Sequence, residues 1–179
     1  MKYFVIVCSI IFLAVMLYLD QLKHFVNNEA YWEGLHIVPI LLFANIFLGI
    51  FYNLSIWYKL NGKTKYGALI AVIGAIVTVV MNVLLIPKIG YTGSAWATLA
   101  CYGTMAIISY LFGQKHYKIN YSIKSIFFYL GASLLFYWSS TLLNLEAESI
   151  FKFGINSLIL LAFLSLIFFL EKPKKALIS

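Results

Sequence analysis

The sequence predicts an all-α integral membrane protein with about six transmembrane helices. Of its 179 residues, 63% are hydrophobic and only 11% are charged, whereas a soluble domain is roughly half apolar and about a quarter charged. The apolar residues fall into long runs, and about 20 such residues are needed for a helix to cross the hydrocarbon core. None of the runs alternates between polar and apolar residues as a barrel strand does. Both observations favour helices that are solvated by lipid.

Six apolar runs are long enough, or nearly so, to cross the bilayer. They cover residues 3–19, 38–58, 66–86, 93–112, 125–143 and 153–170. The first run follows the basic residue Lys2 and could instead be a signal peptide, but no small-residue cleavage site follows it. An uncleaved span is the favoured interpretation.

The charges of the connecting segments alternate along the chain. All basic side chains other than histidine are lysines, and most stand before the first run, between runs two and three, between runs four and five, and in the tail: Lys2, Lys59, Lys63, Lys65, Lys115, Lys118, Lys124, Lys172, Lys174 and Lys175. Carboxylates dominate the 20–37 segment and the segment before the last run. Because lysine-rich segments stay on the cytoplasmic side, both termini are expected in the cytoplasm. The 20–37 segment could lie along the membrane surface or form an ordered outer connector.

Runs three and four are expected to form a close-packed antiparallel hairpin, because small residues recur at helical spacing on one face of each. These residues are Gly67, Ala71, Gly74 and Thr78 in run three, and Gly93, Ala97, Cys101 and Thr104 in run four. Pro87 is expected to end run three, since proline cannot donate the next helical hydrogen bond. Gly90 would allow a tight reversal, and Thr92 would cap the start of run four.

Several kinds of chemistry have no signature in the sequence. The six carboxylates and three histidines are expected in loops or in the tail, and we find no metal-ligand spacing, no phosphate-binding glycine loop and no nucleophile with a nearby base. We therefore expect no enzyme activity, no cofactor, no metal and no nucleic-acid partner. Four asparagines do fall within the runs, at Asn45, Asn53, Asn82 and Asn156. At membrane depth each could bridge two helices or face an aqueous cavity, and bridging is favoured.

Residues 38–67, 82–103 and 109–119 together resemble the C-terminal region of polysaccharide-biosynthesis flippases. The more specific signal is the pattern N-x-x-L-I-P-x-x-G-x-x-G-x-A-x-A-T, which is carried by Asn82, Leu85, Ile86, Pro87, Gly90, Gly93, Ala95, Ala97 and Thr98. A second signal, W-Y-K-L-x-x-K-T, is carried by residues 57–60, Lys63 and Thr64. Within a single transmembrane region, 1–179, the similarity covers about residues 30–120. It is to Wzx-like members of the MOP exporter superfamily, of the Bacteroidetes type.

The resemblance implies a transporter that moves a lipid-linked oligosaccharide across the bacterial cytoplasmic membrane by alternating access, as part of polysaccharide biosynthesis for the cell envelope. Family members have twelve to fourteen helices in two bundles, so this chain is expected to be a C-terminal portion that needs an N-terminal half or a second copy. Lys59, Asn45, Asn53 and Asn82 are the candidate substrate-binding residues. Lys59 could recruit the phosphate, whereas the favoured role of the loop lysines is to fix the orientation and to contact anionic lipid. The alternatives are a small dimerising carrier and a non-transporting membrane scaffold or truncated fragment.

Overall fold

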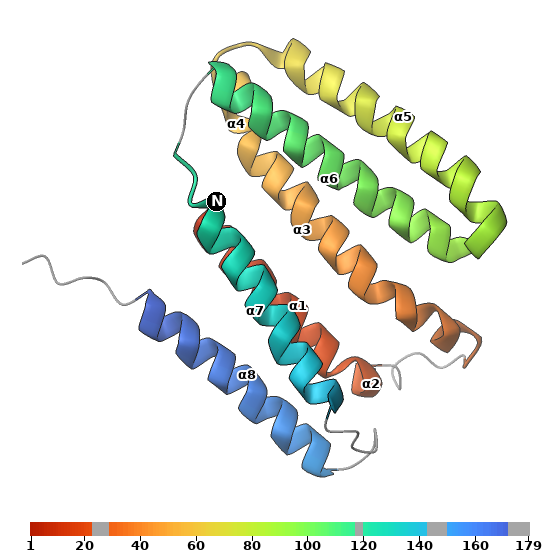
Figure 1. Ribbon diagram of the computed structural model, residues 1–179, viewed down its shortest axis with the longest axis vertical. Helices are drawn as coiled ribbons and strands as arrows, with labels where there is room; N and C mark the ends of the chain where they lie inside the picture. The colour runs from red at the N-terminus through yellow and green to blue at the C-terminus, as the bar shows by residue number, and fades with distance from the viewer. Residues whose placement is uncertain (23–28, 117–119, 143–149, 172–179) are drawn as a thin grey trace, which may run out of the picture. The chain divides into compact units, whose positions relative to one another are not determined.

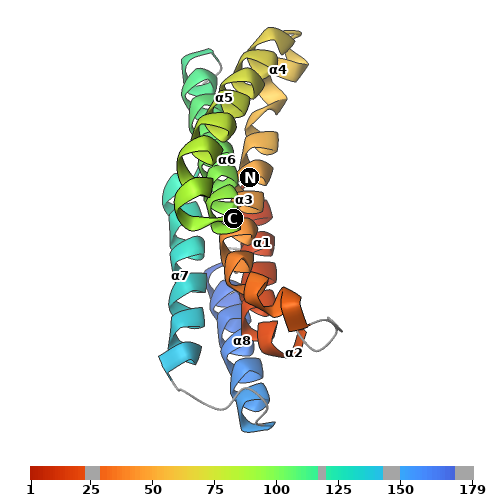
Figure 2. The same ribbon diagram turned by 90° about the vertical axis from the view of Figure 1, so that its right-hand side faces the viewer.

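Figures 1 and 2 show the computed structural model, which describes residues 1–22, 29–116, 120–142 and 150–171. Within those residues the secondary structure is helical, and no strand occurs. The helices are α1 (Lys2–Leu17), α2 (Leu19–Leu22), the 3-10 helix η2 (Glu29–Ile37), α3 (Val38–Leu54), α4 (Ile56–Leu60), α5 (Thr64–Ile89), α6 (Tyr91–His116), α7 (Ile123–Leu142) and α8 (Ile150–Leu170). The prediction of an all-α protein is confirmed.

Five helical segments of the described chain are long and apolar enough to cross a membrane. They are Trp32–Leu60, Thr64–Ile89, Tyr91–His116, Ile123–Leu142 and Phe151–Leu170. The remaining predicted run, residues 3–19, forms α1, which has 16 residues and at 1.5 Å per residue is about 24 Å long, somewhat short of the hydrocarbon core. These are the helices of a multi-pass membrane protein. The side of the membrane on which each end lies stays a prediction, and Lys118 and the tail lysines lie outside the described residues.

The chain divides into two compact units. Unit 1 comprises residues 1–5 and 28–123, and unit 2 comprises residues 6–27 and 124–179. Unit 1 therefore holds η2 and α3 to α6, whereas unit 2 holds most of α1 together with α2, α7 and α8.

In unit 1, α6 lies between α3 and α5 and packs along both helices (Figure 1). Because α6 has a helix on each of two sides, it needs small side chains on both sides to pack closely. All of its buried residues are small: Gly93, Ala95, Ala97, Cys101, Ala106, Ser109 and Gly113. By contrast, α5 packs chiefly against α6 and buries only Ile70 and Gly74. The rest of α5 presents exposed apolar side chains, as is usual for a helix that lies against lipid.

A single residue, Gly90, separates α5 from α6. Its φ is 59° and its ψ is −142°, a backbone conformation that glycine adopts much more readily than residues with a Cβ. The Gly90 N–H still donates to the Ile86 carbonyl at 2.9 Å, which closes the last turn of α5. The expected role of Gly90 in a tight reversal is confirmed.

Two other expectations about this turn are wrong. Pro87 does not end the helix, since α5 continues to Ile89. The φ of proline is compatible with a helix, and the loss of one hydrogen bond in the last turn costs too little free energy to end the helix at Pro87. Thr92 does not precede α6 as a cap but is its second residue. Its hydroxyl lies 2.9 Å from His36 Nε2 instead, because the reversal at Gly90 is so short that α6 begins before Thr92 is reached.

The hairpin interface rests on glycines where the two helices approach most closely. A Cβ built on Gly74 of α5 would lie 2.6 Å from Met105 Sδ and 3.2 Å from Cys101 Sγ, both on α6. A Cβ on Gly93 of α6 would lie 2.8 Å from the Leu85 carbonyl carbon of α5. Small residues therefore allow the close approach that was expected between helices in lipid.

The small-residue face of α5 is shorter than predicted. Ala71 is exposed, and a Cβ on Gly67 would lie 2.8 Å from Tyr58 Cε2 of α4 rather than against α6. The start of α5 therefore packs against the aromatic end of α4, which follows α3 directly in the chain.

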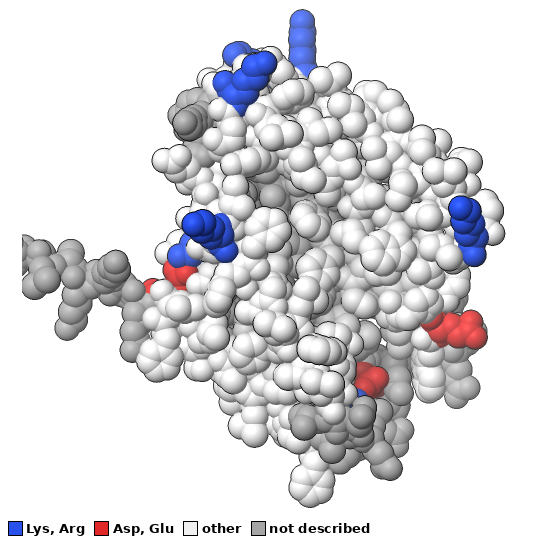
Figure 3. Space-filling model, in the orientation of Figure 1, with Lys and Arg blue, Asp and Glu red and all other residues white. Residues whose placement is uncertain are grey.

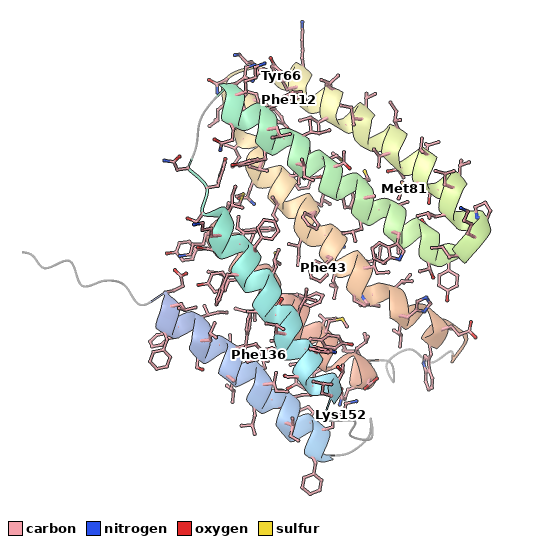
Figure 4. All side chains as sticks on the ribbon, viewed as in Figure 1. Phe43, Tyr66, Met81, Phe112, Phe136 and Lys152 are labelled. Atoms are coloured by element: carbon pink, nitrogen blue, oxygen red, sulfur yellow. The ribbon has the colours of Figure 1, made fainter. Side chains whose placement is uncertain are left out.

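Unit 2 packs α1, α7 and α8 around one apolar core. Its buried residues are Leu13, Leu17, Ala132 and Phe163. Phe136 of α7, labelled in Figure 4, meets Phe163 of α8 edge-on, with ring centroids 5.4 Å apart. This is a favoured geometry for an aromatic pair.

Beside this core, Asn156 of α8 bonds two neighbouring helices. It is 1% exposed; its Nδ2 donates to the Leu17 carbonyl of α1 at 2.6 Å, and its Oδ1 accepts from Ser140 Oγ of α7 at 2.8 Å. One side chain thus satisfies a donor and an acceptor in a place that water does not reach. Helix bridging is confirmed for this asparagine.

Candidate functional site

The two asparagines of α3 bond to their own helix. Asn45 Nδ2 donates to the Leu41 carbonyl at 2.8 Å, and Asn53 Nδ2 donates to the Gly49 carbonyl at 2.9 Å. Asn45 is exposed and Asn53 is half-buried. Neither side chain bridges to another helix within the described residues, so each leaves its carbonyl oxygen as an acceptor on the surface of α3.

The third asparagine, Asn82 of α5, has an unmet hydrogen-bonding capacity. Its Oδ1 is buried and has no partner among the described residues. An unpaired buried acceptor costs roughly 1–3 kcal/mol, so this oxygen is a place where a donor would be stabilising. Asn82 lies two turns before Gly90, towards the η2 end of the hairpin.

Lys59 is exposed in the last turn of α4. Its Nζ lies 5.7 Å from the centroid of the Tyr52 ring, a cation–π distance. A cation in the last turn of a helix is also stabilised by the helix dipole. No hydrogen bond or ion pair within the described chain joins Lys59 to Asn45, Asn53 or Asn82, so the structure does not gather the four predicted residues into one site.

Lys59 instead borders a group of packed rings, which we call the aromatic cluster: Trp57, Tyr58, Tyr66, Phe112 and His116. The Trp57 and His116 rings are stacked, with centroids 5.6 Å apart and planes at 9°. His116 Nε2 lies 3.0 Å from the Tyr66 hydroxyl, and His116 Nδ1 lies 3.0 Å from the Phe112 carbonyl. Figure 4 labels Tyr66 and Phe112, whose rings meet edge-on across the α5–α6 interface. Three helices are tied together at this end of unit 1.

The indole of Trp57 is the buried centre of the aromatic cluster. The residue is 3% exposed, and its Nε1 has no hydrogen-bond partner among the described residues. A Cβ built on Gly113 would lie 3.2 Å from that nitrogen. The absence of a side chain at Gly113 of α6 therefore leaves room for the indole of Trp57 of α4.

Lysines surround the aromatic cluster at the ends of three helices. Lys59 is in the last turn of α4, Lys63 and Lys65 stand at the start of α5, and Lys115 is in the last turn of α6. Figure 3 shows blue side chains gathered at the top of the view, over the α4 end of unit 1. No carboxylate lies within residues 52–66 or 109–116, so this end is positively charged. Such an end attracts phosphate groups and anionic lipid.

The opposite end of the α5–α6 hairpin carries a second small polar group. His36 of η2 pairs through Nδ1 with the Glu33 carbonyl and through Nε2 with the Thr92 hydroxyl. The Tyr91 hydroxyl donates to the same Glu33 carbonyl at 3.3 Å. These contacts attach η2 to the start of α6, and they place a hydrogen-bonded histidine where the sequence predicted only a connecting segment.

The sequence reasoning found Lys59 but missed the aromatic cluster. His116 was expected in a loop after residue 112, whereas α6 extends through His116. The four-residue spacing of Phe112 and His116 could have predicted that both side chains lie on one face of a helix. The pairing of Phe112 and His116 with Trp57 and Tyr66 had no such signal, since the two pairs of residues are 46 or more positions apart in the sequence.

Comparison with protein-family models, with curated proteins and with solved structures gives no match to this chain.

Proposed function

We propose that this protein is a component of a transporter that moves lipid-linked oligosaccharide or polysaccharide units across the bacterial cytoplasmic membrane by alternating access. The observation that carries the proposal is the sequence pattern from Asn82 to Thr98, together with the segment from Trp57 to Thr64 that precedes it. Both resemble the corresponding segments of Wzx-like flippases. The multi-pass helical fold is the kind of scaffold that such a transporter requires.

Two parts of these patterns have structural features that support the proposal. Gly90 and Gly93 allow α5 and α6 to pack closely against each other, and from this close packing we infer that the two helices move as one body during transport. The segment from Trp57 to Thr64 forms the end of α4 and the start of α5, where the aromatic cluster anchors three helices and Lys59 stays exposed. In alternating access, rigid elements of this kind rock against one another around a binding site.

Lys59 is the proposed point of contact with the substrate's phosphate. Lysine acts as a compact, strongly hydrated point charge with three rotatable donors. Lys59 lies next to the amphipathic ring of Tyr58 and over the ring of Tyr52, and such rings prefer the membrane interface. The phosphate of a lipid-linked oligosaccharide lies at the same depth, since its lipid tail is in the hydrocarbon core.

The test is complementation of a flippase-deficient strain, with this chain expressed alone and together with an N-terminal half from a two-bundle flippase. We expect rescue of surface polysaccharide only in the second case. Rescue by the chain alone would favour a dimerising carrier, and no rescue at normal expression would favour a scaffold. Either result would overturn the proposal as stated.

In the rescuing combination, Lys59→Gln is expected to lower transport about fivefold, the equivalent of about 1 kcal/mol for one lysine near the membrane surface. Lys88→Gln is the matched control, because Lys88 is an equally exposed lysine at the other end of the hairpin. Lys59→Arg should restore transport. Equal transport in the Lys59→Gln and Lys88→Gln variants would limit Lys59 to a role in topology.

A further inference from the structure

Unit 2 contains a cavity of about 250 Å³ that the proposed transport does not use. It is lined by Met16, Leu17, Leu19, Asp20, Tyr137, Ser140, Thr141 and Lys152. All of these residues belong to unit 2, and they come from α1, α2, α7 and α8. Figure 4 labels Lys152, near the end of α7.

Two opposite charges form one wall of this cavity. Lys152 Nζ lies 2.7 Å from Asp20 Oδ2, and the two side chains are 20% and 42% exposed. An ammonium group has three N–H donors, and a carboxylate can accept several hydrogen bonds. The contact between them uses one of the three donors of Lys152, and the two oxygens of a carboxylate together offer about four acceptor positions, so both groups can take a further hydrogen bond while the pair stays intact.

Two further polar side chains of the wall, Ser140 and Thr141, are held in place by bonds within the unit. Ser140 donates to the buried Asn156, and Thr141 Oγ1 donates to the Trp138 carbonyl of its own helix at 2.8 Å. Each hydroxyl therefore keeps lone pairs that can accept a hydrogen bond from a ligand. The cavity is a preformed site rather than a gap between mobile side chains.

The cavity lies at the ends of the helices that enclose it. α1 ends at Leu17, α7 ends at Leu142 and α8 begins at Ile150. In a membrane protein the ends of spanning helices lie at the depth of the lipid headgroups. Nearby, Trp138 is 61% exposed and Phe151 is 75% exposed, and aromatic side chains of this kind mark the interface between headgroups and acyl chains.

The charge of the cavity selects among the headgroups found at that depth. Among the described residues that line the cavity, one carboxylate and one ammonium sum to zero, so an anionic headgroup would be repelled by Asp20 and a purely cationic group by Lys152. A headgroup with an ammonium and a phosphate complements both. We propose that this cavity binds the headgroup of a zwitterionic aminophospholipid, with its ammonium on Asp20 and its phosphate on Lys152.

The proposal is independent of any transport activity, and it is tested on the purified chain of residues 1–179 by native mass spectrometry. The probes are dioleoyl phosphatidylethanolamine, phosphatidylcholine and phosphatidylglycerol at equal concentration. Phosphatidylethanolamine is expected to bind about fivefold more tightly than phosphatidylcholine, whose quaternary ammonium has no N–H to donate to Asp20. Glycerophosphoethanolamine, a soluble headgroup without acyl chains, should compete if the headgroup alone is recognised.

Asp20→Asn should change the selectivity of the site rather than merely weaken it. Removal of the carboxylate leaves Lys152 to bind phosphate, so the preference for phosphatidylethanolamine over phosphatidylglycerol should fall about fivefold or reverse. Thr141→Val should weaken phosphatidylethanolamine binding without breaking a contact between described helices, because among the described residues its hydroxyl bonds to its own helix. Tyr129→Phe is the matched control: it removes a 2.6 Å hydrogen bond to Glu171 at the other end of α7 and should leave lipid binding unchanged.

Equal binding of phosphatidylethanolamine and phosphatidylcholine by the wild-type protein would overturn the proposal. So would an unchanged lipid preference in a folded Asp20→Asn variant, since an ion pair with a purely structural role would alter stability but not selectivity. If Asp20→Asn fails to fold, the comparison of Thr141→Val with Tyr129→Phe decides, and equal lipid binding by those two variants refutes the site.

Discussion

Gly93→Ala should be the most damaging of three glycine-to-alanine substitutions in the α5–α6 hairpin. The added Cβ would lie 2.8 Å from the Leu85 carbonyl carbon and 2.9 Å from the Ile86 nitrogen. The first distance is about 0.7 Å short of the ordinary carbon–carbon separation of about 3.5 Å. Both neighbours are backbone atoms, so no side-chain rotation can relieve the contact and the helices must separate. We expect a loss of about 1–3 kcal/mol in the free energy of unfolding.

Two control substitutions separate this effect from helix propensity. At Gly74 the Cβ would lie only 2.6 Å from Met105 Sδ, but methionine is flexible and can move away. We therefore expect Gly74→Ala to change the stability by less than about 1 kcal/mol. Gly103 has no atom within 4 Å of the added Cβ, so Gly103→Ala should be neutral or stabilising by up to about 1 kcal/mol.

The assay is reversible unfolding of the purified protein by sodium dodecyl sulfate in mixed micelles, followed by circular dichroism. The expected order of stability is Gly103→Ala, then Gly74→Ala, then Gly93→Ala. If Gly93→Ala is as stable as Gly74→Ala, the backbone contact at the turn does not limit the approach of the helices, and the reasoning fails.

The remaining predictions concern the other helix contacts and the topology. Gly113→Ala should displace the Trp57 indole, shift its fluorescence emission and cost about 1–3 kcal/mol; an unchanged spectrum and stability would show that the indole does not need the room that Gly113 leaves. Asn156→Leu should destabilise unit 2 by about 1–3 kcal/mol, because Ser140 and the Leu17 carbonyl lose their hydrogen-bond partner. A stability equal to that of the wild type would show that these hydrogen bonds between helices do not stabilise unit 2. Single cysteines at Glu33 and Lys63, in a cysteine-free background, should differ in labelling of intact cells by an impermeant reagent, with Glu33 labelled. Labelling of Lys63 alone would invert the topology.

The sequence predicted local features of unit 1 well, and it failed where helix ends depend on their neighbours. Gly90 was expected to reverse the chain and does so, because a positive φ is a property of one residue. Pro87 was expected to stop α5, but a proline in the last turn removes only one bond and the helix runs on to Ile89. Thr92 was expected to cap α6, but its hydroxyl pairs with His36, which is 56 residues away in the sequence.

The polar contacts of unit 2 show the same limit. Lys152 stands at the start of the last span. The charge pattern predicts carboxylates rather than lysines in this segment, and the sequence alone does not explain why a lysine occurs here. In the structure it pairs with Asp20, 132 residues away, and the pair lowers the cost of each charge near the membrane. Asn156 could be recognised as a polar residue in a span, but its partners on α1 and α7 could not.

The sequence by itself therefore determined the membrane class, the number of apolar runs and the hairpin turn, because composition, run length and glycine conformation act within a few consecutive residues. Only the tertiary structure decided that Trp57 stacks on His116, that α6 packs between α3 and α5, and that Asp20 and Lys152 line one cavity. In lipid, helices associate through close packing and specific polar contacts rather than through a general hydrophobic drive. Which helices meet depends on shape and on partners far apart in the chain, and a local reading of the sequence does not contain that information.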